Sequence, residues 1–72
     1  MVDRDEILGL GHQIRLIRKA RGISQEELAY RVGMHRNTIG CIERGERMPS
    51  LESLGEIAGA LGVSIKSLFP ER

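Results

Sequence analysis

Residues 24–49 read SQEELAYRVGMHRNTIGCIERGERMP, and the spacing of this segment predicts two short helices joined by a tight turn. The first helix covers about residues 25–31, because Ser24 is a good cap and Glu27 follows it at the spacing of a capping box. Gly33 tolerates the positive φ that often ends a helix. The second helix therefore starts within a few residues of the end of the first.

The second helix of this segment, over about residues 36–44, has an apolar inner face and a polar outer face. Its two isoleucines point inward, and its outer face carries Arg36, Asn37 and Cys41. Two helices joined by a short turn with glycine are the helix-turn-helix arrangement of DNA-binding proteins. Arginine and asparagine can bind base edges bidentately in the major groove. The segment therefore predicts a DNA-binding unit.

An apolar stripe at helical spacing predicts an earlier helix over about residues 5–20. The members of the stripe are Ile7, Leu10, Ile14 and Ile17. Gly9 and Gly11 each weaken the first half of this helix by about 0.5–1 kcal/mol relative to alanine. We therefore expect this half to fray.

Two further helices follow the motif, and serine caps mark their starts. Ser50 precedes a helix over about residues 51–61, and Ser64 precedes a short fifth helix that Pro70 ends. Valine, isoleucine and threonine nowhere alternate over a run long enough for a strand. The sequence therefore predicts an all-α fold of five helices, in one small domain over residues 1–72.

Charge is unevenly distributed along the chain, although the net charge is only +1. Residues 15–47 hold eight basic and four acidic residues, a net +4, and the rest holds three basic and six acidic residues, a net −3. This asymmetry fits one phosphate-facing surface on an otherwise acidic body. A mixed, solvated surface fits the same counts, so charge alone leaves both interpretations open.

Composition argues against several other classes of protein. Cys41 is the single cysteine, which excludes an internal disulfide. The first ten residues lack the apolar run of a signal peptide, and no segment has 18 consecutive apolar residues, so we expect a cytoplasmic protein without a membrane span. Two histidines and one cysteine form neither a metal site nor a nucleophile–base set by spacing. We therefore expect no enzyme activity and no cofactor.

The pattern of the chain from about Gly11 to Phe69 resembles the phage-repressor/Cro-like (XRE-type) helix-turn-helix family. The matching residues are Ile14-Arg15, Arg18, Gly22-Ile23-Ser24-Gln25-Glu26-Glu27-Leu28-Ala29, Gly33, Thr38-Ile39, Ile42-Glu43-Arg44-Gly45, Pro49-Ser50-Leu51, Ile57-Ala58 and Leu61-Gly62-Val63-Ser64. The resemblance implies a compact five-helix domain whose third helix lies in the major groove.

The resemblance also implies roles for individual residues. Base reading is expected from Arg36, Asn37 and Cys41 on the third helix. Phosphate binding is expected from Gln25, Thr38, Arg44, Arg47 and His35. Gln25 and His35 could instead be exposed residues at helix starts. Thr38 could instead be a helix-surface residue or contact a thymine methyl. Arg47 could instead enter a minor groove.

Arg18 and Glu43 occupy positions at which the family often has an ion pair. Such a pair would link the first helix to the end of the third, and would orient the recognition helix instead of reading bases. Removing one partner would then leave an uncompensated charge.

Two positions depart from the family pattern. Cys41 stands where the family often has a polar or charged base reader, and its thiol offers apolar contact with thymine but little hydrogen bonding. A redox role for Cys41 would need a resolving partner, which the nearby sequence does not supply. Gly40 loosens the recognition helix by about 0.5–1 kcal/mol. It either allows close approach of the backbone to DNA or is a tolerated defect.

We expect a transcription regulator that binds a near-palindromic operator as a homodimer. We expect dimerisation through the fourth and fifth helices, over about residues 51–69, with Ile65, Leu68 and Phe69 at the interface, although Phe69 could instead cap the core of its own protomer. Size and layout resemble the controller proteins of restriction–modification systems, which regulate their own promoters. Antitoxins and phage repressors share this layout, and activation would need a contact with RNA polymerase. A protein-interaction adaptor is the alternative from another class, and RNA binding is weaker because exposed aromatic residues are scarce.

Overall fold

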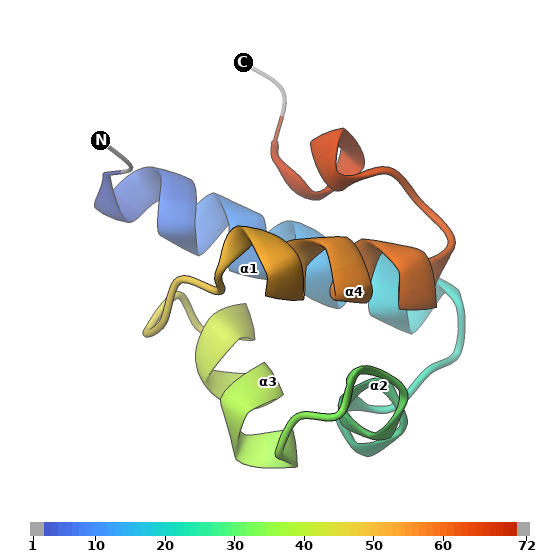
Figure 1. Cartoon of the computed structure of the whole chain (residues 1–72). Helices are drawn as coiled ribbons and strands as arrows, with labels where there is room; N and C mark the ends of the chain where they lie inside the picture. Colours follow the sequence, from blue (N-terminus) through green and yellow to red (C-terminus); the bar gives the residue numbers. More distant parts are fainter. Residues whose placement is uncertain (1–2, 71–72) are drawn as a thin grey trace.

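The computed structural model describes residues 3–70, which form four α-helices and one short 3-10 helix without any strand (Figure 1). The elements are α1 (Arg4–Ala20), α2 (Gln25–Val32), α3 (Arg36–Glu43), α4 (Leu51–Leu61) and η1 (Ile65–Leu68). The predicted all-α class is confirmed for this part of the chain, and the expected fifth helix is the 3-10 turn η1. The predicted domain also included residues 1–2 and 71–72, which lie outside the described residues.

Side chains at the predicted positions cap the helices. The hydroxyl of Ser24 accepts a hydrogen bond from the backbone N–H of Glu27 at 3.0 Å, and Ser50 and Ser64 cap α4 and η1 in the same way. The carboxylate of Glu27 turns to Arg31, 2.9 Å away, so the second half of the expected capping box is replaced by an ion pair. Gly33 ends α2 with a φ of 68°, as its sequence position predicted.

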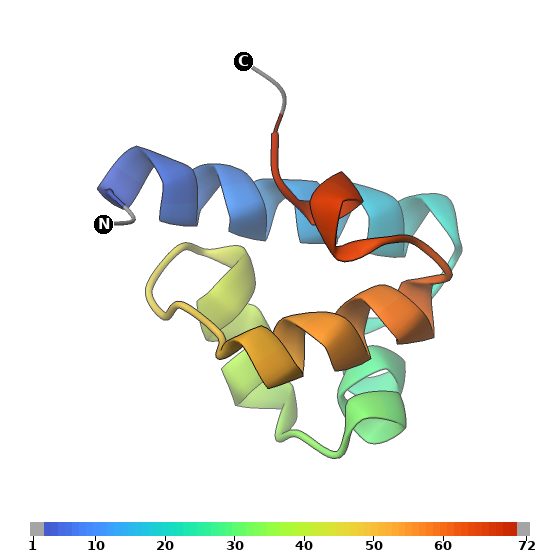
Figure 2. The same ribbon diagram turned by 45° about the horizontal axis from the view of Figure 1, so that its top comes forward.

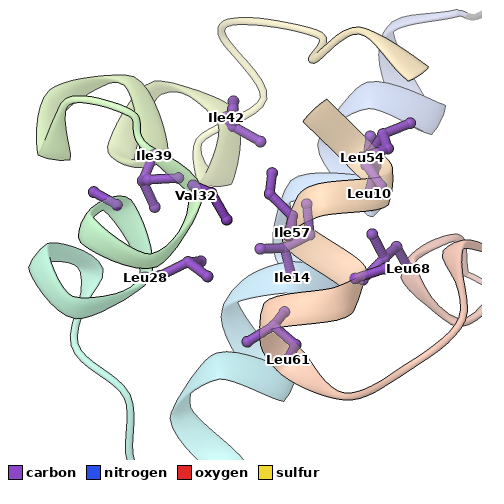
Figure 3. Close-up of a cluster of buried hydrophobic side chains, with 12 residues drawn as sticks. Leu10, Ile14, Leu28, Val32, Ile39, Ile42, Leu54, Ile57, Leu61 and Leu68 are labelled. Carbon is purple, nitrogen blue, oxygen red and sulfur yellow. The ribbon is translucent and has the colours of Figure 1, made fainter. Parts of the chain in front are cut away.

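The helices pack around a shared centre. α3 packs against both α1 and α2, α2 packs against α4, and η1 closes the far side against α1 and α4 (Figure 2). The buried apolar side chains come from every element and meet between them (Figure 3). They are Leu10, Ile14, Leu28, Ala29, Val32, Ile39, Ile42, Leu54, Ile57, Ala58, Leu61 and Leu68. This core fixes α3 with its two isoleucines inward.

Gly11 lies at a close contact between helices, a role that its sequence position did not indicate. The expected fraying of the first half of α1 stays a prediction. The helix is continuous from Arg4, and Gly11 is buried against the end of α3. A Cβ at Gly11 would collide with the backbone carbonyl of Ile42 and would lie 2.7 Å from that of Glu43. The absence of a side chain therefore allows α1 and α3 to approach closely, and this contact helps to set the position of α3.

Candidate nucleic-acid interface

The outer face of α3 carries the predicted base readers. Because Ile39 and Ile42 are buried, the opposite side of the helix faces solvent. Arg36 and Asn37 are exposed there, and Cys41 is half-buried one turn later. Arg36 has a loose ion pair with the carboxylate of Glu26 at 3.7 Å, in which both side chains are largely exposed. Both predicted hydrogen-bonding readers are therefore accessible to a ligand.

His35 caps the start of α3. Its Nδ1 accepts a hydrogen bond from the backbone N–H of Asn37 at 3.2 Å, and its side chain is exposed. This geometry is the helix-start role that the sequence leaves open beside phosphate binding. Phosphate binding by His35 stays a prediction.

Arg18 and Glu43 form a buried, two-point ion pair between α1 and α3. Nε of Arg18 donates to Oε2 of Glu43 at 2.7 Å, and Nη2 donates to Oε1 at 3.0 Å. Nη1 of Arg18 donates to the backbone carbonyl of Ile23 at 2.8 Å. Among residues 3–70, these two are the buried charged residues. The pair therefore joins α1, the loop before α2 and the end of α3 at one point.

Gln25 belongs to the same network. Its Nε2 donates to Oε1 of Glu43 at 3.0 Å, so the first residue of α2 is tied to the last residue of α3. Every buried side-chain nitrogen and oxygen of the described residues has a hydrogen-bond partner. The expected phosphate contact of Gln25 stays a prediction, and it would use the second proton of the same amide nitrogen.

A basic cleft of about 250 Å³ opens beside this network. It is lined by Arg15, Arg18, Lys19, Gln25, Glu43 and Arg44. Since Arg18 and Glu43 neutralise one another, the remaining charge of the cleft comes from three cations. Two of these, Arg15 and Lys19, were not singled out from the sequence. They lie four residues apart on α1 and so share a helical face, and this spacing was the signal that could have found them.

Arg44 is clipped to Glu46 at the mouth of the cleft. Nε of Arg44 donates to Oε2 of Glu46 at 2.9 Å, and Nη2 donates to Oε1 at 3.3 Å. The hydrogen bond and charge of Glu46 raise the pKa of Arg44, and those of Arg44 hold the pKa of Glu46 below its ordinary value. Arg44 therefore meets a carboxylate of its own chain at the place where a DNA phosphate was expected.

Thr38 and Arg47 lie together on another part of the surface. Both line a groove of about 310 Å³ between α3 and the start of α4, with Met34, Ile42, Met48, Pro49, Ser50 and Ser53. Thr38 is half-buried and Arg47 is exposed. The structure thus separates the predicted phosphate binders into the basic cleft, with Gln25 and Arg44, this second groove, and the start of α3, where His35 lies.

One predicted interface residue is corrected. Leu68 is fully buried in the core of its own protomer, so it does not lie on a surface that could meet a partner. The 3-10 geometry of η1 turns it inward between α1 and α4. Ile65 and Phe69 are partly buried and also pack against this core. Phe69 lines a groove of about 550 Å³ with Gln13, Lys66, Ser67 and Pro70.

Comparisons with known proteins agree with the fold and the motif. A family model described as helix-turn-helix matches residues 14–68. Control protein C.BamHI of Bacillus amyloliquefaciens is 44% identical over 60 residues, which cover 82% of this chain and 74% of that protein. The crystal structure of the restriction-modification controller protein C.AhdI from Aeromonas hydrophila has a TM-score of 0.85 and 38% identity, over 88% of this chain and 96% of that chain.

A phage protein is also similar. The immunity repressor protein of Bacillus phage phi105 is 37% identical over 62 residues, which cover 86% of this chain and 43% of the repressor. This chain therefore spans less than half the length of that relative. Among the described residues, no helix is both long and apolar enough to cross a membrane.

Proposed function

The chain belongs to the helix-turn-helix family of DNA-binding transcription regulators, and we propose that it binds a near-palindromic operator as a homodimer, as a controller of a restriction–modification system. The observation that carries this proposal is the exposed face of α3 beside a basic cleft that reaches α1 and the start of α2. The identity to two control proteins, each covered over more than two thirds of its length, favours the controller role.

In this proposal the surface divides into base readers and phosphate binders. Arg36 and Asn37 would contact base edges from α3, because their side chains are exposed and can bond bidentately to guanine and adenine. Arg15, Lys19 and Gln25 would hold one backbone strand in the cleft, where the start of α2 adds free N–H groups. The buried Arg18–Glu43 pair would keep these two surfaces in a fixed relation.

Selection from random duplexes tests the proposal directly. The wild-type chain is incubated with a pool of random duplexes at several salt concentrations, and the bound fraction is sequenced. We expect a near-palindrome whose half-sites lie about one helical turn, about 34 Å, apart. A wild-type chain that enriches no sequence would overturn the proposal and favour a protein-interaction adaptor.

Two variants separate the proposed roles. Arg36→Ala should relax the preference at one base pair of each half-site, at a cost of about 1–3 kcal/mol. Lys19→Gln should weaken binding to all sequences alike, and should reduce the slope of log K against log salt by about 0.9 for each phosphate that is no longer neutralised. Equal effects of both variants on every sequence would contradict the assignment of Arg36 as a base reader.

A further inference from the structure

The side chain of Arg44 is docked on its own recognition helix, although it is more than half exposed. Its guanidinium meets the carboxylate of Glu46 at two points, 2.9 and 3.3 Å long. Nη2, which also donates to Glu46, lies 3.6 Å from Sγ of Cys41. Three partner atoms in the same short stretch of chain thus hold a side chain that would otherwise be free to move.

Gly40 provides the space in which this guanidinium lies. A Cβ at Gly40 would lie 2.9 Å from Nη1 of Arg44, 3.8 Å from Cζ and 3.9 Å from Nη2. The planar group therefore covers Gly40, which is buried as a result. The two departures from the family pattern, Gly40 and Cys41, thus have a common structural consequence, because both border the docked arginine.

The backbone places Glu46 where it can hold Arg44. Gly45 has a φ of 74°, a conformation that L side chains rarely adopt, and it turns the chain back after α3. The backbone N–H of Glu46 then donates to the carbonyl of Cys41 at 2.9 Å. Glu46 is therefore anchored to the last turn of the recognition helix and is not a freely moving surface residue.

We propose that Glu46 is a built-in competitor of DNA phosphate for Arg44, and that it lowers affinity for every duplex alike. The inference rests on the proposed DNA binding. A carboxylate and a phosphate offer the same pair of oxygen acceptors, so a phosphate that binds the Nε–Nη2 edge of Arg44 competes with Glu46 for the same protons. Glu46 then weakens the sequence-independent, electrostatic part of binding to every duplex, and discrimination between sequences depends on the base readers proposed on the outer face of α3.

A double-variant cycle tests this competition. The probes are a fluorescent duplex selected by the wild-type chain and a scrambled duplex of the same length and composition. Glu46→Gln should raise affinity for both duplexes by about threefold to fivefold at low salt, which is the range that the loss of one exposed ion pair supports. In the Arg44→Ala background, Glu46→Gln should change affinity by less than about twofold, because the competition needs Arg44.

Glu27→Gln is the matched control. It removes the same charge from another exposed ion pair, with Arg31, at the same distance of 2.9 Å and with similar exposure. We expect no gain in affinity from it. The shift in salt slope supplies a further readout: Glu46→Gln should steepen it with Arg44 present and leave it unchanged without Arg44.

The outcomes separate this inference from the proposed function. If the wild-type chain and Glu46→Gln bind neither duplex, both proposals fail. If the wild-type chain binds the selected duplex but Glu46→Gln has the same effect with and without Arg44, the carboxylate only repels DNA at a distance and the competition is overturned. Equal gains from Glu46→Gln and Glu27→Gln would overturn it as well, because net charge would then explain the change.

Discussion

Two arginine–glutamate ion pairs meet at the end of α3, where Glu43 of one is next to Arg44 of the other, and they differ in burial. The pair of Arg18 and Glu43 is buried and hydrogen-bonded to the backbone, so its effect appears in the free energy of unfolding. The pair of Arg44 and Glu46 is exposed, so it adds little to folding and its effect appears when a ligand competes for the arginine. Burial therefore determines which measurement reports on each pair.

Replacing Glu43 with alanine should lower the free energy of unfolding by about 3–5 kcal/mol, because the guanidinium of Arg18 would stay buried without its partner. At the ordinary stability per residue, the free energy of unfolding of a chain of 72 residues is about 4–11 kcal/mol. The expected loss would be a large fraction of it. Urea unfolding followed by circular dichroism measures it.

The double variant Arg18→Met with Glu43→Leu is the control for this prediction. It removes both charges and keeps apolar volume, so we expect it to be more stable than Glu43→Ala alone. A double variant as unstable as the single one would show that the pair acts through something other than an uncompensated buried charge.

Replacing Arg44 with alanine should raise the pKa of Glu46 towards its ordinary value. The hydrogen bond and charge of Arg44 are the main causes that hold this pKa low, with a smaller contribution from Cys41. A carboxyl whose folded pKa is lowered contributes stability above its unfolded pKa, and this contribution disappears as pH falls through the folded value. The measurement is an NMR titration of the Glu46 carboxyl carbon.

Arg47→Ala is the control for the titration, because it removes the same charge from the same loop but leaves the Arg44–Glu46 ion pair in place. We expect it to leave the pKa of Glu46 unchanged. A Glu46 titration that is identical in the wild type and in Arg44→Ala would mean that the two side chains are not paired in solution.

At the level of helices, the site is held by one close contact between α1 and α3. Gly11→Ala should lower the free energy of unfolding by about 1–3 kcal/mol, as overpacking does, because the added methyl meets two backbone carbonyls that cannot yield easily. Gly59→Ala is the matched variant, since nothing lies within 4 Å of its added Cβ. It should stabilise the chain by about 0.5–1 kcal/mol through helix propensity.

Thermal unfolding of both glycine variants checks this pair of predictions. Opposite signs are expected for the same chemical change in two helix interiors. A stabilising Gly11→Ala would show that α1 and α3 are not in backbone contact.

Local rules predicted the helices well, because caps and glycines act within a few residues. Ser24, Ser50 and Ser64 marked the starts of their elements, and Gly33 marked an end. Periodicity also predicted that Ile39 and Ile42 would point inward, which determined the outer face of α3. The outer face of α3, on which we expect base reading, could therefore be outlined without a structure.

Contacts between distant parts of the chain were beyond those rules. Gly11 looked like a weak point because its partner carbonyls lie more than 30 residues later. Leu68 looked available to a partner because the residues next to it in the sequence do not indicate that η1 packs against α1 and α4. The ion pair of Arg44 with Glu46 depends on the turn at Gly45, so the sequence indicated the arginine but not the carboxylate that holds it.

For the whole molecule, the proposed dimer must join two copies without covering the outer face of α3. With Leu68 in the core, the remaining candidates for the interface are Ile65 and Phe69, both partly covered by their own protomer. Phe69 borders a groove between α1 and η1, in a part of the surface separate from the basic cleft. A second copy bound there would leave the outer face of α3 open in both protomers.

A rigid dimer predicts a strict dependence on operator spacing. Inserting two base pairs between the selected half-sites rotates one half-site by about 70° and moves it by about 7 Å, so one recognition helix can no longer reach its bases. Affinity should then fall by at least about a hundredfold, towards that of a single half-site, since each misread base pair costs about 1–3 kcal/mol. Competition binding with the spaced and the original duplex measures the fall, and two base pairs added outside the half-sites should leave the affinity unchanged.

Two independently bound monomers would tolerate the insertion, and sedimentation would then show one copy for each half-site without association in free solution. If affinity depends on spacing and the free chain sediments as a dimer, the distance between the two recognition helices is set by contacts between the two protomers.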